Sequence, residues 1–231
     1  ASMIDPAQRR AITRLVRSNV EPESQAAVKK AARQSADQDL VEFSLSLLQA
    51  IPPSPVSHVE GGAAGLAVVE YLARQPQAPP AIVLAAQAAP KTMFPTSRRA
   101  LATIALESAA AASPSAFARM GIEMVDACYP PYPFDGATAG TSALDALAEM
   151  PLDETTRSYL SDARAQLNSL TDHEERAEQA LKTLQQVVTM SEHAQEVSSL
   201  AQSTQGGSIQ ETPSAVRVGG IMLPRKRAVL S

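Results

Sequence analysis

The residues that could carry out acid–base, nucleophilic or metal chemistry are few and dispersed along this chain. The three histidines, His58, His173 and His193, fall in different predicted elements. His173-Glu174 begins like the helical zinc motif of metalloproteases, but residue 177, where a second histidine is needed, is alanine. We therefore expect no metal site, and we interpret His173 as part of a solvated helix start.

The single cysteine and the glycine-rich segments offer no better site. Cys128 follows an apolar helix face and has no base close in sequence, so we expect an inert thiol. Residues 136–142 are one residue too short for a phosphate-binding loop and lack its lysine and its preceding strand. We predict a loop and a helix cap at Thr141. Because no pair of acids stands out either, we predict no catalytic residue, no cofactor and no enzymatic activity.

Basic residues near the two ends are the clearest candidate binding features. Three of the arginines in the first predicted helix recur at the i, i+4 and i+7 spacing, which places them on one face. Two interpretations stay open: a solvated face that pairs with the protein's own acidic body, or contacts to phosphates or an acidic partner. No aromatic residues interleave with these charges, so any nucleic acid would be contacted through its backbone. The candidate contacts are Arg9, Arg10, Arg14, Arg17, Arg225, Lys226 and Arg227.

The distribution of charge also singles out the two ends of the chain as candidate binding regions. The formal net charge is −4, yet residues 1–33 carry seven Lys and Arg against three acids. Residues 205–231 carry four against one, and the body between them is acidic. Such asymmetry says more about partners than about fold.

The composition indicates an all-α protein. The chain has 231 residues and 45% hydrophobic residues, but no Trp, four Phe and four Tyr, so much of its core is expected to be alanine. Alanine favours helix and β-branched runs are scarce. Ser57 and Glu60 have the spacing of a capping box, and Gly61, Gly62 and Gly65 in the same helix indicate close approach to a neighbour. Prolines and N-caps predict helices over 5–17, 22–34, 37–50, 57–74, 80–89, 96–112, 114–128 and 141–150.

A heptad pattern sets the region after Pro151 apart. Its apolar positions alternate by three and four residues, the spacing of a narrow seam between paired helices. The phase slips by one residue near Val187 and then continues through Met190, Ala194, Val197 and Ala201. Thr171 caps a second helix, so we favour a hairpin of 153–169 and 172–203 over one rod. The candidate helix–helix interface is Leu160, Leu167, Leu170, Leu181, Leu184 and Val188.

These patterns together predict a multi-helix bundle with a C-terminal coiled-coil-like helical hairpin and an irregular basic tail. We expect three parts: an Ala/Pro-rich helical bundle over 1–150, the coiled-coil-like region over 151–204, and a flexible basic tail over 205–231. No apolar run approaches the roughly 20 residues of a membrane helix. We also find no signal peptide and expect a cytoplasmic or virion location, not secretion.

The function expected from these features is a non-enzymatic helical assembly protein. It would self-associate or dock a protein through 153–203, with non-specific nucleic-acid contacts through its basic termini. A viral or phage capsid or nucleocapsid-associated protein is one concrete version. The first alternative is a bacterial scaffold or adaptor, for example in secretion, that binds a partner through its tail. The second is an enzyme with a site of dispersed carboxylates.

Overall fold

The structure, a computed structural model, describes the backbone of residues 5–217 and the side chains of residues 5–204. Over this range it contains ten α-helices, one short 3-10 helix and no strand. The all-α prediction is confirmed. Contacts divide the chain into two compact units, one up to Val188 and one from Thr189 onward, and each is described by itself.

Prolines and capping residues set where the helices of the first unit begin. Seven helices have proline at their first position, where the missing N–H costs nothing and the fixed φ suits a helix. The helices are α1 (Pro6–Ser18), α2 (Pro22–Gln34), α3 (Leu40–Gln49), α4 (Pro55–Ala73), α5 (Pro80–Ala88), α6 (Pro95–Glu107), α7 (Pro114–Cys128), α8 (Pro133–Ala148), α9 (Glu154–Asn168) and α10 (His173–Arg217), with a 3-10 turn at Ala89–Lys91.

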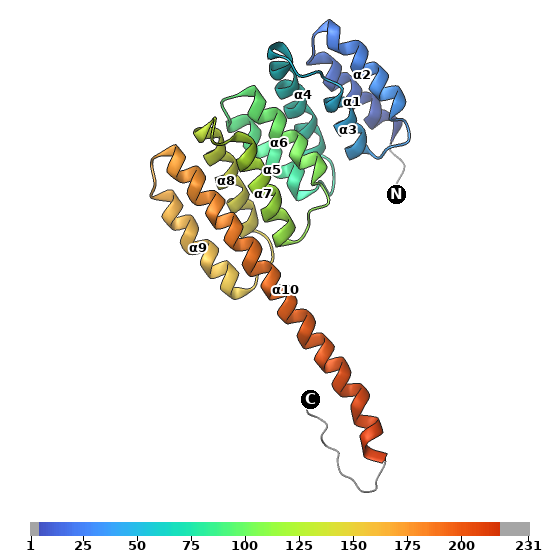
Figure 1. Cartoon of the computed structure of the whole chain (residues 1–231). Coiled ribbons are helices and arrows are strands. Elements are labelled where there is room, and N and C mark those ends of the chain that lie inside the picture. The colour runs from blue at the N-terminus through green and yellow to red at the C-terminus, as the bar shows by residue number, and fades with distance from the viewer. Residues whose placement is uncertain (1–4, 218–231) are drawn as a thin grey trace. The chain divides into compact units, whose positions relative to one another are not determined.

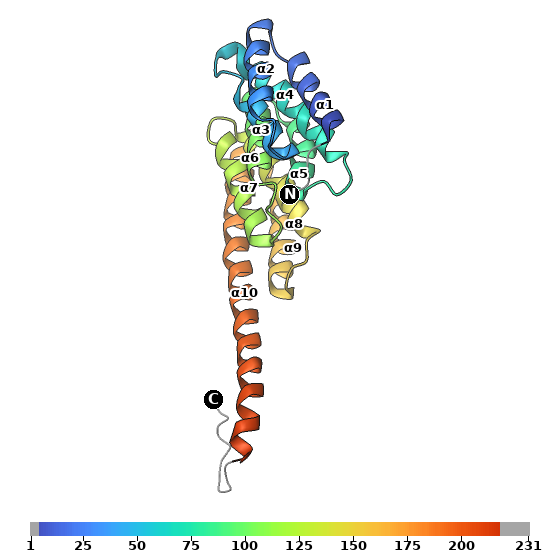
Figure 2. The same cartoon turned by 90° about the vertical axis from the view of Figure 1, so that its right-hand side faces the viewer.

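Helices that are close in sequence lie side by side in the first unit. α1, α2 and α3 pack together, α4 packs on α5 and α6, and α7 packs on α8, which also contacts α9 (Figures 1 and 2). One continuous core runs through these helices. Its bulk comes from Phe43 and Phe117 together with aliphatic residues and many alanines, as the composition predicts.

The glycines of α4 allow α6 to approach closely, as predicted. A Cβ added at Gly62 would lie 2.7 Å from the carbonyl oxygen of Pro95 and 3.0 Å from its Cα. A Cβ at Gly65 would lie 2.9 Å from Cβ of Ala102. The first contact is to backbone, which cannot move aside as a side chain can, so Gly62 sets the spacing of this helix pair.

We predict that Gly62→Ala lowers the free energy of unfolding by about 1–3 kcal/mol because it overpacks this contact. The loss should occur although alanine has the higher helix propensity, by about 1 kcal/mol. Urea unfolding followed by circular dichroism measures it. The control is Ala63→Gly on the exposed side of the same helix, which should cost only the propensity difference. A Gly62→Ala protein more stable than wild type would contradict the prediction.

Three predicted helix starts are wrong. α3 begins at Leu40, after its cap Asp39, rather than at Asp37. The starts of α4 and α8 differ as well. α4 is capped by Ser54, which accepts from the N–H of Ser57 at 3.0 Å, so the capping box of Ser57 and Glu60 is not formed. α8 begins at Pro133, and Thr141 lies in its middle rather than at a cap. For α4 and α8, a proline at the first helical position decides the start.

The region after Pro151 divides into two helices, α9 and α10, with a break over 169–172. Asp172 rather than Thr171 caps α10, since its carboxylate accepts from the N–H of Glu175 at 2.9 Å. Residues up to Val188 belong to the first unit, so α9 and the start of α10 group with the helices that precede them. α10 then continues to Arg217, beyond the predicted helix end near 203. Gly206 and Gly207 lower helix propensity by about 1 kcal/mol each without ending the helix.

None of the described helices has a stretch both long and apolar enough to cross a membrane.

Candidate functional site

The clearest candidate site is a groove along α1. Asp5 caps this helix by accepting from the N–H of Ala7 at 2.9 Å, and Pro6 occupies the first position. Ile12 and Val16 are fully buried, which fixes the rotation of the helix. With that face buried, Arg10 and Arg14 are exposed on the side that borders the groove.

All four N-terminal candidate arginines line this one hollow, which we call the arginine groove. Its volume is about 670 Å³, within the range typical of small-molecule sites. α2 contributes Gln25 and Ala32 to its walls, and α3 contributes Phe43. The lining residues are Pro6, Arg9, Arg10, Thr13, Arg14, Arg17, Ser18, Gln25, Ala32 and Phe43.

Arg9 is held in place from two sides. One Nη atom donates to the carbonyl of Ala32 at 3.0 Å, and the guanidinium carbon lies 4.5 Å from the ring centroid of Phe43. Its Nε–H is buried and has no hydrogen-bond partner. The Nε–H of Arg17 is buried and unpartnered as well. Unpaired buried donors are costly, but both Nε–H groups are shielded from solvent, so an acceptor from outside the chain would reach them only after the side chains move.

The arginine groove has no counter-charge from the protein's own acids. Among residues 5–204, Arg164 forms an ion pair with Asp145, but no such pair with a carboxylate within 4.0 Å is found for any of the four groove arginines. The interpretation of this face as pairing with the acidic body therefore finds no contact in its favour. Arg225, Lys226 and Arg227 lie outside the described residues.

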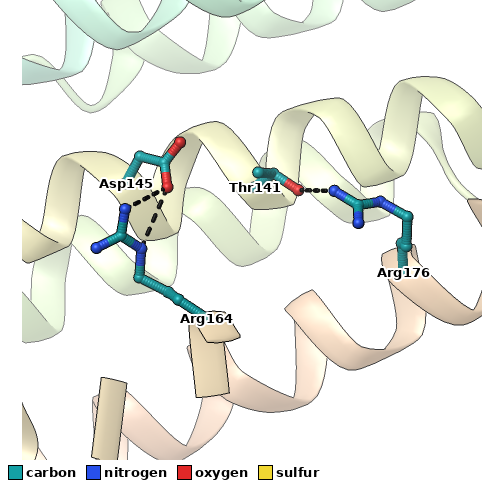
Figure 3. Close-up of polar contacts among 4 residues, drawn as sticks. All are labelled: Thr141, Asp145, Arg164 and Arg176. Atoms are coloured by element: carbon teal, nitrogen blue, oxygen red, sulfur yellow. Dashed lines mark hydrogen bonds and ion pairs between the residues drawn. The ribbon is translucent and has the colours of Figure 1, made fainter. Parts of the chain in front are cut away.

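A second hollow of about 320 Å³ lies on α8 beside the start of α10. Arg176 donates to the carbonyl of Leu167 near the end of α9 at 2.8 Å and to that of Leu170, just after this helix, at 3.1 Å. It also reaches Thr141 at 3.4 Å (Figure 3). Asp145 is bound by Arg164, through two nitrogens at 2.8 and 3.2 Å (Figure 3). These charges hold helices together. The glycine-rich segment 136–142 borders this hollow inside α8 and forms no loop, which corrects the prediction.

Two buried carboxylates each cap another helix. Glu60 accepts from the N–H of Glu21 at 2.8 Å and from Ser24 at 3.0 Å, at the start of α2. Asp135 is fully buried and binds the start of α6. Helix N-termini present free N–H groups and partial positive charge, so a carboxylate is stabilised there. Sequence reasoning missed both roles because the capped helix lies far away along the chain.

Cys128 and His173, two of the residues considered from the sequence, each contact neighbouring side chains. Cys128 is fully buried, and burial raises the pKa of its thiol to about 11, an effect that Asp135 reinforces and a hydrogen bond with Ser97 opposes. The thiol is therefore protonated at neutral pH. His173 packs edge-on against Phe134 at 4.9 Å. No group of three or more His, Cys, Asp and Glu side chains in the described part is arranged to hold a metal.

The predicted helix–helix interface is covered by the chain itself. Leu160, Leu167, Leu184 and Val188 are buried, and Leu170 and Leu181 are partly buried against the same core. Met190 and Ala194, the next apolar residues of the stripe, are still partly buried, and exposure begins at Val197. Val197 is 52% exposed and Leu200 is 68% exposed. An apolar surface open to a partner is thus found on α10 only after Val188.

Comparison with known proteins gives no assignment. No protein-family model, curated protein or solved structure matches the chain. The features that can support a functional proposal are therefore the arginine groove and the exposed part of α10.

Proposed function

We propose that the protein is a non-enzymatic helical assembly protein that self-associates through residues 189–204 of α10, which we call the distal segment. The observation that carries the proposal is the apolar stripe on this segment, which is partly buried at Met190 and Ala194 and exposed from Val197 onward. Met190, Ala194, Val197 and Ala201 are spaced by four, three and four residues, and Leu200 lies beside them. This is the spacing of a coiled-coil seam.

A helix of this kind needs a neighbour. In proteins, most helical stability comes from packing of an apolar face rather than from intrinsic propensity. Val197 and Leu200 are large apolar side chains with more than half of their surface exposed. Burying a fully exposed side chain of this kind gains about 1.5–3 kcal/mol, so burying the remaining half to two thirds of each would gain about 1–2 kcal/mol.

The flanking residues favour a second copy of the same helix. With Met190 and Val197 at d positions and Ala194 and Ala201 at a positions, the flanking e and g positions hold Ser191, His193, Ser198 and Leu200. The acids, Glu192 and Glu196, fall at f and c positions on the outer face. Like charges at e and g oppose pairing of identical helices, and none are present here.

We predict that the double variant V197E/L200E weakens self-association at least about 100-fold, since it removes two apolar contacts and places carboxylates in the seam. Light scattering after size-exclusion chromatography over a range of concentrations measures this. The matched control Q195E/S199E adds the same charge at b and f positions and should associate like wild type. A wild-type protein that stays monomeric throughout, or a control that dissociates equally, contradicts the proposal.

The same chromatography distinguishes two versions of the proposal. In a capsid or nucleocapsid-associated protein, the basic termini would retain nucleic acid, and nuclease would lower the ratio of absorbance at the nucleic-acid maximum to that at the protein maximum. In an adaptor, nuclease would change nothing. The chain has no Trp and four Tyr, so a small amount of bound nucleic acid would dominate its absorbance.

A further inference from the structure

We infer that the arginine groove is a binding site for a ligand that carries two or more neighbouring phosphate groups. The inference rests on α1, α2 and α3 of the first unit and is independent of self-association through the distal segment. It concerns the four arginines that line one hollow of about 670 Å³.

The first argument is charge density. Four guanidinium groups border this hollow, and no carboxylate among residues 5–204 neutralises them. A carboxylate supplies one negative charge, whereas a phosphate monoester supplies close to two and offers three acceptor oxygens. A free compound with two or three linked phosphates therefore brings more charge to the four arginines that line this hollow than a peptide of similar size. A phosphodiester backbone carries one charge per phosphate, so for that source the argument is the spacing given below.

The second argument is the pair of unused donors. The Nε–H groups of Arg9 and Arg17 have no partner and no contact with solvent, so an anion would reach the Nε–H of Arg17 only if that side chain moved, while the Nε–H of Arg9 stays covered. Arg9 cannot swing away easily, because Ala32 and Phe43 hold its guanidinium group. A side chain that is pre-oriented in this way loses little conformational entropy when an anion binds. Arginine presents Nε and Nη as a fork that matches two oxygens of one phosphate.

The third argument is spacing. Arg10, Arg14 and Arg17 follow one face of α1 over a length of about 10 Å, at a rise of 1.5 Å per residue. Neighbours at three or four residues are about 5–6 Å apart at Cβ. A row of linked phosphates can contact them in succession. The groove's aromatic ring, Phe43, is already covered by Arg9, so base stacking contributes nothing to this site.

Two sources share this chemistry: a free polyphosphorylated compound and the phosphodiester backbone of a nucleic acid. Titration calorimetry with inorganic tripolyphosphate, at fixed ionic strength, tests the shared chemistry. A second arm with a short oligothymidylate distinguishes the sources. Binding of tripolyphosphate alone indicates a free compound, and binding of both with the same arginine dependence indicates a strand. Either result supports the proposal.

We predict that R10Q/R14Q weakens tripolyphosphate binding at least about 10-fold, because it removes two charge-assisted contacts. Both side chains are exposed, so the fold should be retained. The matched control R33Q/R74Q removes the same charge from exposed arginines outside the groove and should bind like wild type. R17K keeps the charge but lacks Nε–H, and should weaken binding about 5-fold if the fork matters.

Three outcomes would overturn the inference. The first is no tripolyphosphate or oligothymidylate binding by wild type. The second is an equal loss of tripolyphosphate affinity in R10Q/R14Q and in the control R33Q/R74Q, which would show that overall charge rather than the groove determines binding. The third is tighter binding of polyglutamate than of tripolyphosphate at equal ionic strength, which would assign the groove to an acidic protein segment.

Discussion

Asp135→Ala should lower the free energy of unfolding by about 3–5 kcal/mol, one of the two largest losses we expect from a single substitution in this chain. Asp135 is fully buried in the first turn of α8. Its carboxylate accepts from the N–H of Met93 at 2.7 Å, from the N–H of Phe94 at 3.1 Å and from Ser97 Oγ at 2.6 Å. Alanine would remove the acceptor from all three donors, and Ser97 among them is buried.

The size of this loss follows from where the donors lie. The N–H groups of Met93 and Phe94 belong to the approach and start of α6, and Phe94 makes no side-chain cap of its own. Asp135 therefore takes the place of a local N-cap and also joins α8 to α6. A loss of this size is a large part of the total stability of a domain, which is about 5–15 kcal/mol.

Urea unfolding of three variants checks the Asp135 prediction. Asp145→Ala, on the same helix, is the matched control: its partner Arg164 is partly exposed, so the loss should be at most about 1 kcal/mol. Asp135→Asn keeps one acceptor oxygen but turns an NH₂ group toward a donor, so its loss should be intermediate. The assignment of Asp135 as a remote cap fails if D135A and D145A unfold at the same urea concentration.

Leu184→Ala is the second substitution from which we expect a large loss, about 2–5 kcal/mol. Leu184 is fully buried, and a Cβ added at Gly121 of α7 would lie 3.2 Å from its Cδ2. α10 thus lies directly on α7 at this level. Truncation would remove apolar contacts and leave a cavity that these closely spaced helices cannot fill.

The matched control for Leu184→Ala is Leu200→Ala, four to five turns further along α10. Leu200 is 68% exposed, so at low protein concentration its truncation should change the free energy of unfolding by no more than about 0.5 kcal/mol. Thermal unfolding at two protein concentrations measures both variants. Equal losses at low concentration would contradict the division of α10 into a packed part and an exposed part.

The two proposals concern different parts of the molecule. Self-association rests on the distal segment, and anion binding rests on the arginine groove of the first unit. V197E/L200E should leave tripolyphosphate binding unchanged, and R10Q/R14Q should leave the oligomeric state unchanged. Failure of one proposal therefore leaves the other standing.

The sequence by itself determined the fold class and most helix boundaries. Prolines at first helical positions, such as Pro22 and Pro114, exclude a helical interior and favour a helix start, so their effect is local. The placement of Arg10, Arg14 and Arg17 on one face of a helix could also be predicted, because it depends only on helical periodicity. The break before α10 was also predicted correctly.

Tertiary structure decided what each surface faces. The apolar spacing over 160–201 is similar along its length and does not reveal where the surface is buried. The interface residues up to Val188 are covered by the protein's own helices, whereas Val197 and Leu200 are exposed. Periodicity shows that a face is apolar but does not show what lies against it. Likewise Glu60 and Asp135 cap other helices by accepting from N–H groups that lie 39 and 41 residues away along the chain. Such contacts depend on how distant segments pack, and no local pattern encodes them.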